Sequence, residues 1–304
     1  MIESVFYFAV PVFFMITGAT LMDYRKRYST AVFLKKRFVR TVIPYLGWVL
    51  FELVFCVCYL KTTDPGQVTL RYVVNGVING SLGTGIFWFF MPLFGVYLCM
   101  PLLSAVEERL RTPMFSYLAV LAFVLHSLIP FVIDLFHINL SFTFRLPGVG
   151  EYLFYCIVGY LLVQNELSPR WRGAIYLLSL FALGLHMAGT YVLSMTAGAV
   201  STAFKGYLSA PCAVYSVGVF VFLKYAGRRL LTNETLSRLV MFLKNYTLPF
   251  YLIHRFVHDV LITEFSIDPR SLAYRLIGPV VIVLIVIPLT DLMRKVPVLR
   301  RFVP

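Results

Sequence analysis

The chain has 304 residues, of which 60% are hydrophobic and 13% are charged, and its formal net charge is +13. A soluble domain is usually about 45–50% apolar and about one-quarter charged, so this composition excludes an ordinary soluble globular domain. The apolar residues gather in blocks of about 18–22, the length that a helix needs to cross a bilayer. The composition therefore predicts an all-α fold, a polytopic bundle of membrane helices. The positive charge does not indicate a nucleic-acid partner, because most basic residues lie in short connections where they orient helices.

The first predicted span contains the stretch VPVFFMITGATL, residues 10–21. No basic segment precedes it and no A-x-A cleavage site follows it, so it is predicted to be a membrane helix and not a signal peptide. Thr17 and Gly18 give this helix a small-residue face that allows close packing beside a polar cavity. Because no connection between the apolar blocks has room for a soluble domain, residues 1–304 are predicted to form a single membrane domain. About nine spans are predicted: Ile2–Met22, Val39–Leu60, Thr84–Val106, Met114–Ile133, Pro147–Val163, Gly173–Ser194, Tyr207–Tyr225, Tyr246–Thr263 and Tyr274–Met293.

The basic residues are distributed unevenly between the two sides of the membrane. Alternate connections and the C-terminus hold twenty of the 27 lysines and arginines. The positive-inside rule therefore predicts a cytoplasmic C-terminus. With nine spans the N-terminus would lie outside, directly at the start of an apolar helix, which is an unusual arrangement. We expect one further helix before Met1, which would place both ends inside.

Ionisable side chains within the predicted spans are the main functional signal. Each costs about 3 kcal/mol or more at the bilayer centre and so usually faces a cavity. His254 and His258 are four residues apart, on one helix face, with Arg255 and Asp259 beside them, and this group favours a functional site. A two-histidine metal site is an open alternative, but no third ligand is evident from spacing, so no metal is predicted. A polar cavity on the outer side is predicted to include, besides these residues, Glu52, Arg145 and Glu151.

The basic stretch FLKKRFVRTVIP covers residues 33–44. Arg37 and Arg40 are three residues apart, so both project from one side of a helix that enters the membrane. Guanidinium groups there suit phosphate oxygens. Simple topogenic charge explains the pair equally well. The five cysteines all fall in apolar blocks without metal-ligand spacing, so they are interpreted as buried thiols outside any disulfide framework.

Five stretches in this order resemble the acyltransferase 3 family: VPVFFMITGATL, FLKKRFVRTVIPYLGW, FWFFMPLFGVYLCMPLL, YLFYCIVGYLL and TLPFYLIH. The resemblance runs from Val10 to about His258. It implies a multi-span membrane enzyme that moves acyl groups, often acetyl, onto sugars and other acceptors at the bacterial surface.

The family's motifs correspond to particular positions of this chain. Its PVFF-x-x-SG motif falls on the first predicted span, where Thr17 replaces the usual serine and keeps a hydroxyl. Its R-x-x-R motif falls on Arg37 and Arg40, which the resemblance assigns to gripping an acyl-CoA donor. Its aromatic WF pair falls on Trp88 and the residue after it, and its YLIH motif ends at His254.

The start of the chain departs from the family pattern. The family's first helix carries an arginine and the histidine usually proposed as catalytic, and neither has a counterpart here. This departure agrees with the topology argument, which independently asks for a helix before Met1. The chain is therefore interpreted as a shortened gene model, a decayed copy or an enzyme that uses other histidines.

The resulting hypothesis is a membrane O-acyltransferase in the bacterial cytoplasmic membrane. It would move an acyl group, with acetyl favoured, from cytoplasmic acyl-CoA to a hydroxyl of an envelope glycan or lipid-linked saccharide. Such a reaction needs a base for the hydroxyl and donors for the developing oxyanion. His254 or His258 is the candidate base, with His254 preferred, and Arg255 or Arg145 the candidate oxyanion partner. No bound cofactor, metal ion or nucleic acid is expected, and the cavity is predicted to be lined by Thr17, Glu52, Trp88, Arg145, Glu151 and Arg255.

A transporter or exporter of lipid-linked saccharides is the alternative from another functional class. It would explain the same polar cavity and aromatic content. Transporters often contain internal repeats and broken helix pairs, and neither is evident in this sequence. An inactive family member is the third possibility.

Overall fold

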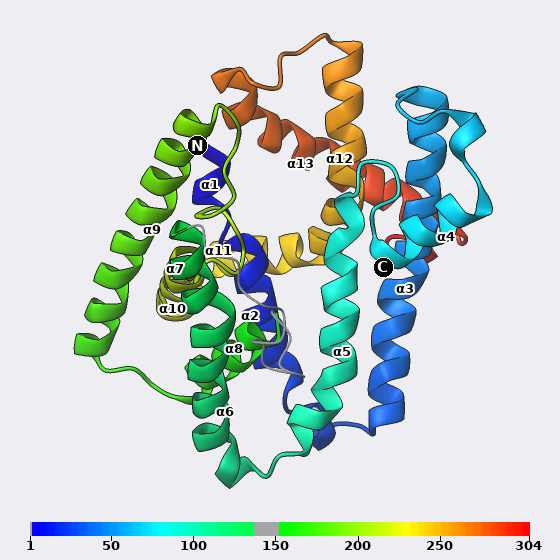
Figure 1. The fold of residues 1–304 in the computed structure, drawn as a ribbon. Helices are drawn as coiled ribbons and strands as arrows, with labels where there is room; N and C mark the ends of the chain where they lie inside the picture. Colours follow the sequence, from blue (N-terminus) through cyan, green and yellow to red (C-terminus); the bar gives the residue numbers. More distant parts are fainter. Residues whose placement is uncertain (1, 137–151) are drawn as a thin grey trace. The chain divides into compact units, whose positions relative to one another are not determined.

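The computed structural model describes residues 2–136 and 152–304, and these residues form helices joined by loops and turns, with no strand among them (Figure 1). Two helices continue into short π-helical turns, Phe55–Tyr59 after α3 and Val124–Leu128 after α6. The helices are α1 (Ile2–Val5), α2 (Ala9–Leu21), α3 (Thr30–Val54), α4 (Leu70–Asn79), α5 (Phe90–Ala105), α6 (Glu108–Phe123), α7 (Ile129–Leu135), α8 (Leu153–Gln164), α9 (Pro169–Ala197), α10 (Ala210–Leu230), α11 (Glu234–Leu243), α12 (Thr247–Glu264) and α13 (Leu272–Lys295).

The predicted multi-pass membrane architecture is supported by helix length and composition. Within the described chain, seven helical stretches are long and apolar enough to cross a membrane. The other two predicted spans correspond to α8, an apolar helix of 12 residues, and α12, which has 18 residues and carries Arg255, Asp259 and Glu264. The count of nine spans therefore stays a prediction. The seven stretches are Ile2–Lys26, Thr30–Tyr59, Ile86–Ala105, Glu108–Leu135, Pro169–Ala197, Ala210–Leu230 and Leu272–Lys295.

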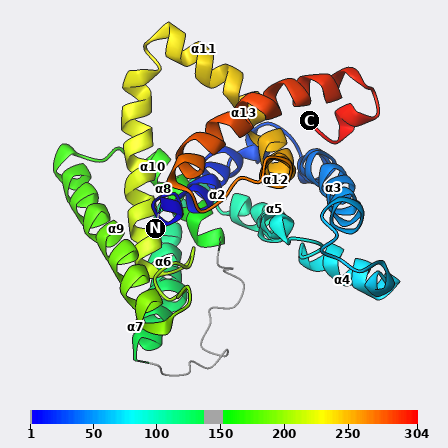
Figure 2. The same cartoon turned by 90° about the horizontal axis from the view of Figure 1, so that it is seen from above.

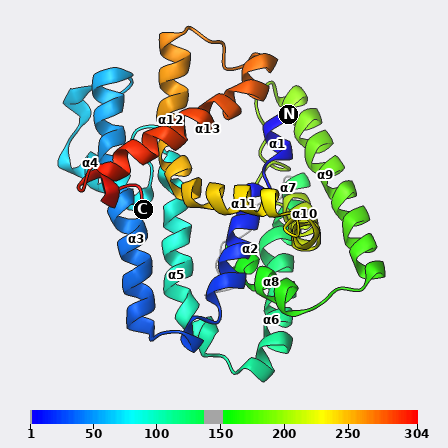
Figure 3. The same ribbon diagram turned by 180° about the vertical axis from the view of Figure 1, so that it is seen from behind.

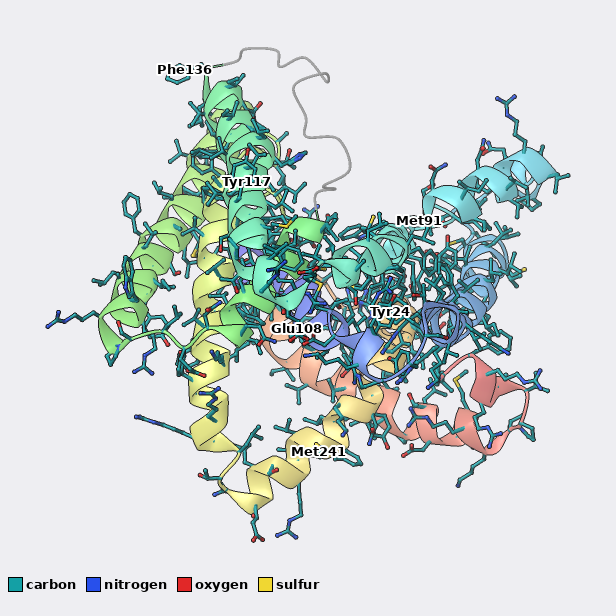
Figure 4. All side chains as sticks on the ribbon, turned by 90° about the horizontal axis from the view of Figure 1, so that it is seen from below. Tyr24, Met91, Glu108, Tyr117, Phe136 and Met241 are labelled. Carbon is teal, nitrogen blue, oxygen red and sulfur yellow. The ribbon has the colours of Figure 1, made fainter. Side chains whose placement is uncertain are left out.

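Large apolar side chains on the helix surfaces agree with a bilayer as the surrounding solvent. Figure 4 labels Glu108 at the start of α6, Tyr117 within it and Phe136 just beyond α7. Tyr117 is 68% exposed and Phe136 is 70% exposed. A soluble monomer rarely exposes broad apolar surface of this kind, whereas a membrane helix presents it to lipid tails.

The chain divides into two compact units, and each takes segments from both halves of the sequence. Unit 1 contains Met1–Ser29 and Cys99–Thr232, and unit 2 contains Thr30–Leu98 and Asn233–Pro304. The single membrane domain predicted over residues 1–304 stays a prediction.

In unit 1, the predicted small-residue face of the first span makes a very close helix crossing. Helix α2 packs along α8 (Figure 3), and a Cβ atom added at Gly18 would lie 1.9 Å from the carbonyl oxygen of Cys156. The reverse contact is equally close, because a Cβ at Gly159 would lie 2.1 Å from the carbonyl oxygen of Met15. The two glycines therefore let the two backbones touch. This confirms the close packing predicted for Gly18.

Helices α9 and α10 run side by side in the same unit (Figure 2). Their contact also depends on a glycine, because a Cβ at Gly218 would lie 1.9 Å from the hydroxyl oxygen of Ser179. Both helices begin at a serine whose hydroxyl accepts a backbone N–H, Ser168 for α9 and Ser209 for α10. Such caps satisfy donors that the first turn of a helix leaves open.

Two charged groups of unit 1 have structural roles. The guanidinium of Arg111, only 6% exposed, lies 2.5 Å from the carboxylate of Asp23 and donates to the carbonyls of Ser104 and Val106. Between α8 and α9, Glu166 accepts from Arg228 at 2.7 Å and from the hydroxyl of Tyr225 at 2.9 Å. Arg111 therefore joins the loop after α2 to the start of α6.

The Glu166 cluster gives a pH-dependent prediction. The hydrogen bond from Arg228, followed by that from Tyr225, lowers the pKa of Glu166 from 4.5 to about 2. Because the folded-state pKa is lowered, the stabilisation is fully present above about pH 4.5 and is lost as the pH falls toward 2. We expect Glu166→Gln to lose less stability than the parent protein does as the pH falls from about 4.5 toward 2. The difference should be small and salt-sensitive, because the group is exposed and screened. Thermal unfolding in detergent across this pH range measures the effect, and Glu234→Gln, which removes an exposed carboxylate elsewhere, is the control. Identical pH profiles for all three proteins would contradict the prediction.

In unit 2, the end of the chain folds back onto α3. The indole nitrogen of Trp48 donates to the carbonyl of Phe302 at 2.9 Å, and Arg294 donates to the carbonyl of Val303 at 3.1 Å. Val303 is completely buried. A Cβ at Gly47 would lie 2.3 Å from the ring of Phe302, so this glycine makes room for the returning tail.

Candidate active site

The two candidate histidines lie on α12, which crosses α13 in unit 2 (Figure 1). Pro249 occupies the first turn of this helix, where its missing N–H costs nothing. Ile253 and Phe256 are buried and hold the helix against its neighbours. His254 and His258 follow one another on an adjacent, half-buried face.

Asp259 joins Arg255 and His258 on α12. Its carboxylate is 5% exposed, and its two oxygens accept from Nε of Arg255 at 2.9 Å and from Nδ1 of His258 at 3.1 Å. A buried carboxylate needs such partners to offset its lost hydration. The functional role that the sequence predicts for these residues stays a prediction.

This contact fixes how His258 presents its imidazole. Because Nδ1–H donates to the carboxylate, the lone pair is on Nε2, and Nε2 has no hydrogen-bond partner within the described part of the chain. The imidazole is 26% exposed and lies against the ring of Tyr274, with 5.6 Å between ring centroids. His258 therefore carries an oriented, accessible basic nitrogen.

His254 has the same tautomer for a different reason. Its Nδ1 lies 2.9 Å from the carbonyl of Phe250 and 2.8 Å from that of Tyr251, and both of these atoms can only accept. The lone pair of His254 is thus also on Nε2, and its ring stacks on Phe250. Since both histidines are held with Nε2 available, geometry alone allows either of them to act as a base.

Two further predicted residues, Trp88 and Glu52, lie in unit 2. Trp88 is in the loop between α4 and α5, and Glu52 on α3 contacts that loop. Tyr251 donates its hydroxyl to the carbonyl of Ile86 at 2.6 Å, which ties α12 to the turn that contains Trp88. In the same loop, the backbone N–H and the hydroxyl of Thr84 both donate to Oε1 of Glu52. The second carboxylate oxygen of Glu52 is buried without a described partner.

The loop that meets Glu52 needs its glycines. Gly80, Gly83 and Gly85 have φ between 62° and 71°, a region that residues with a Cβ rarely adopt. A Cβ at Gly83 would also lie 2.9 Å from Cγ of Glu52. The sequence GSLGTG therefore forms the close approach between this loop and α3, which positions Trp88.

The arginines of the R-x-x-R motif have different surroundings on α3. Arg37 is half-buried, its guanidinium carbon is 5.9 Å from the ring centre of Phe33, and its Nε is buried without a described partner. Arg40 is exposed and lines a separate hollow with other basic residues. The two arginines, predicted to project from one side of the helix, therefore differ in exposure, with Arg37 half-buried and Arg40 exposed.

The remaining predicted residues are less informative. Thr17 lies in unit 1, where its hydroxyl donates to the carbonyl of Phe13 at 2.9 Å within its own helix. Arg145 and Glu151 lie outside the described residues. The polar cavity that would unite all of these side chains stays a prediction. Among the residues that the structure describes, no three His, Cys, Asp or Glu side chains are arranged to hold a metal ion.

An apolar groove runs beside the histidine face of α12. Its volume is about 580 Å³ and its walls are almost entirely apolar, formed by α3, α12, α13 and the C-terminal tail. Ile253 and Val257, each one residue before a candidate histidine, line it. The groove has no signal in the sequence, because its apolar lining residues are typical of any membrane span.

The comparisons with known proteins agree with the motif resemblance. No curated protein and no solved structure matches the chain. Residues 1–290 match the acyltransferase 3 family, described as an acyltransferase domain, and this match covers nearly the whole chain. The protein therefore belongs to the acyltransferase 3 family.

Proposed function

We propose that this protein is a membrane O-acyltransferase that moves an acyl group, with acetyl favoured, from acyl-CoA to a hydroxyl of an envelope glycan or lipid-linked saccharide. The observation that carries the proposal is the contact between His258 and the buried Asp259, which leaves an oriented basic nitrogen on a helix of this family. A carboxylate–imidazole pair is suited to take a proton from a hydroxyl and hold it during acyl transfer.

In the proposed reaction, Nε2 of His258 takes the proton of the acceptor hydroxyl as its oxygen attacks the thioester carbonyl. Asp259 stabilises the imidazolium that results. The terminal nitrogens of Arg255 have no described partner, so they are available to donate to the oxyanion. Collapse of the tetrahedral intermediate breaks the C–S bond, and the proton passes from His258 to the departing thiolate of coenzyme A.

We assign the donor's phosphates to Arg37. Its buried Nε without a described partner is a donor that an incoming phosphate would satisfy, and a guanidinium can hold phosphate in a bidentate manner. Arg40 is the second residue that the resemblance assigns to the donor.

The groove beside α12 supports a lipid-linked acceptor. An almost wholly apolar wall of this size suits a hydrocarbon chain, and it adjoins the face that carries both histidines. A saccharide attached to such a chain would be presented at Nε2 of His254 or His258.

The test is acyl transfer by the purified protein in nanodiscs, with radiolabelled acetyl-CoA and an extract of lipid-linked saccharides. We expect labelled saccharide together with one released thiol per acetyl group. Proteoliposomes loaded with the same saccharides provide the second arm. Saccharide movement across the bilayer without any use of acetyl-CoA would overturn the enzyme and favour a transporter, and inertness in both arms would favour an inactive family member.

We further propose that the protein lies in the cytoplasmic membrane with its C-terminus inside. The uneven basic charge supports this orientation. In a background without the five native cysteines, Ser266→Cys is expected to react with a membrane-impermeant maleimide from outside intact cells. Ser29→Cys should react only after the membrane is opened. Labelling of Ser29→Cys alone in intact cells would reverse the topology.

A further inference from the structure

A basic hollow of about 790 Å³ lies where the start of α3 meets the end of the C-terminal tail, both within unit 2. Its cations are Lys35, Lys36 and Arg40 from α3 and Arg301 from the tail, and no acidic side chain lines it. The lining positions on α3 are 32, 35, 36, 39, 40 and 43, and each has another of them three or four residues away, so they form one stripe.

The fourth cation is held at this place by the fold of the tail. The carbonyls on the C-terminal side of Arg301 are fixed, since Phe302 accepts from Trp48 and both Val303 and Pro304 accept from Arg294. Arg301 thus reaches the hollow from a long distance in sequence. It also lies beyond residue 290, where the family match ends.

Among the described residues that line the hollow, no acidic side chain balances the cations, and Pro304 also lines it. Lys35, Arg40 and Arg301 have no ion pair with any residue that the structure describes. Bringing like charges together is unfavourable unless an anion joins them, and arginine with lysine suits phosphate oxygens.

The rest of the hollow indicates what the anion is attached to. Val32, Val39 and Ile43 line the same stripe, and they are 40%, 52% and 39% exposed. The stripe lies in the first half of the candidate span Thr30–Tyr59 and runs from its cationic start toward its apolar middle. A phosphate group bound by the cations would therefore have a hydrocarbon-compatible surface directly beside it, which free phosphate does not need.

We infer that this hollow binds an anionic phospholipid of the surrounding bilayer, with its phosphate on Lys35, Lys36, Arg40 and Arg301 and an acyl chain along Val32, Val39 and Ile43. Arg40, which the resemblance assigns to the acyl-CoA donor, is assigned here to the lipid, so this inference leaves Arg37 alone at the donor's phosphates. It assigns to the C-terminal tail a role besides its packing against α3 and its hydrogen bonds with Arg294.

The test compares two neighbouring arginines of the tail, in the purified protein. Arg301 lines the hollow, whereas Arg300 is also exposed and is not among the lining residues. Native mass spectrometry measures retention of phosphatidylglycerol against phosphatidylcholine after extraction from nanodiscs that contain both. We expect Arg301→Gln to weaken phosphatidylglycerol binding about fivefold, because a basic residue near anionic lipid contributes about 1 kcal/mol. Arg300→Gln and the charge-conserving Arg301→Lys should change it little, and thermal unfolding in phosphatidylcholine nanodiscs checks that all variants are folded.

Three outcomes would overturn the inference. Equal losses in Arg300→Gln and Arg301→Gln would mean that the tail acts only through net charge. Displacement of the lipid by glycerol 3-phosphate would mean that the hollow takes a free phosphate. If coenzyme A displaces the lipid, and Arg301→Gln weakens both alike, the hollow is part of the donor site. None of these measurements requires acyl transfer, so the lipid site and the catalytic proposal fail or succeed separately.

Discussion

Replacing His258 with glutamine is expected to lower acyl transfer by about 10²–10⁴-fold, the contribution typical of a positioned general base. Glutamine preserves much of the size and hydrogen bonding of histidine but cannot take a proton. Asp259→Asn should cause a loss of similar order while His258 is still present, because an amide no longer holds the imidazole with Nε2 free or stabilises its cation. Acetyl-CoA consumption and labelled product are measured together, at matched protein amounts in the same membrane.

The two histidines can be distinguished within this experiment. His254 has only carbonyl oxygens at Nδ1, so its imidazolium would lack the carboxylate that stabilises that of His258. We expect His254→Gln to reduce transfer less than His258→Gln does. If His254→Gln abolishes transfer and His258→Gln does not, the base is His254, as the sequence resemblance prefers. Normal transfer in both variants would remove this face of α12 from the chemistry.

Much of the membrane architecture could be predicted because lipid imposes simple rules on the chain. An apolar block of sufficient length must be a helix, and the predicted spans correspond to helices wherever the structure describes them. The pairing of His254 and His258 follows from helix periodicity alone. These features depend on residues near one another in sequence.

The features that could not be predicted depend on chain segments that meet only in the fold. Nothing near Arg111 in the sequence indicates that it pairs with Asp23, and nothing near Arg301 indicates that it meets α3. In both cases a basic residue in a connection has a sufficient topogenic explanation, which hides its second role. Glu52 is a similar case, since its partner Thr84 lies 32 residues away in a glycine-rich loop.

The largest expected effect on stability comes from the crossing of α2 and α8. Gly18→Ala or Gly159→Ala would place a methyl group about 2 Å from a backbone carbonyl oxygen of the other helix, and backbone atoms cannot rotate away as a side chain can. Overpacking typically costs about 1–3 kcal/mol, occasionally more, so either variant should unfold at a clearly lower temperature in detergent. Gly184→Ala, in α9 of the same unit, is the matched control, because its new methyl group would meet no atom within 4 Å.

The double variant tests whether the two glycines serve one crossing. Gly18 approaches Cys156 while Gly159 approaches Met15, so the two contacts are a few residues apart on the same pair of helices. A single outward shift of α8 would relieve both clashes, which means that Gly18→Ala and Gly159→Ala together should destabilise by less than the sum of their separate effects. Fully additive losses would show that the helices do not cross at this distance. The same would follow if the double variant unfolded at the temperature of Gly184→Ala. Small residues at such a crossing stabilise membrane helices through close backbone packing in place of the hydrophobic effect. For this reason even one added carbon at either position is expected to weaken unit 1.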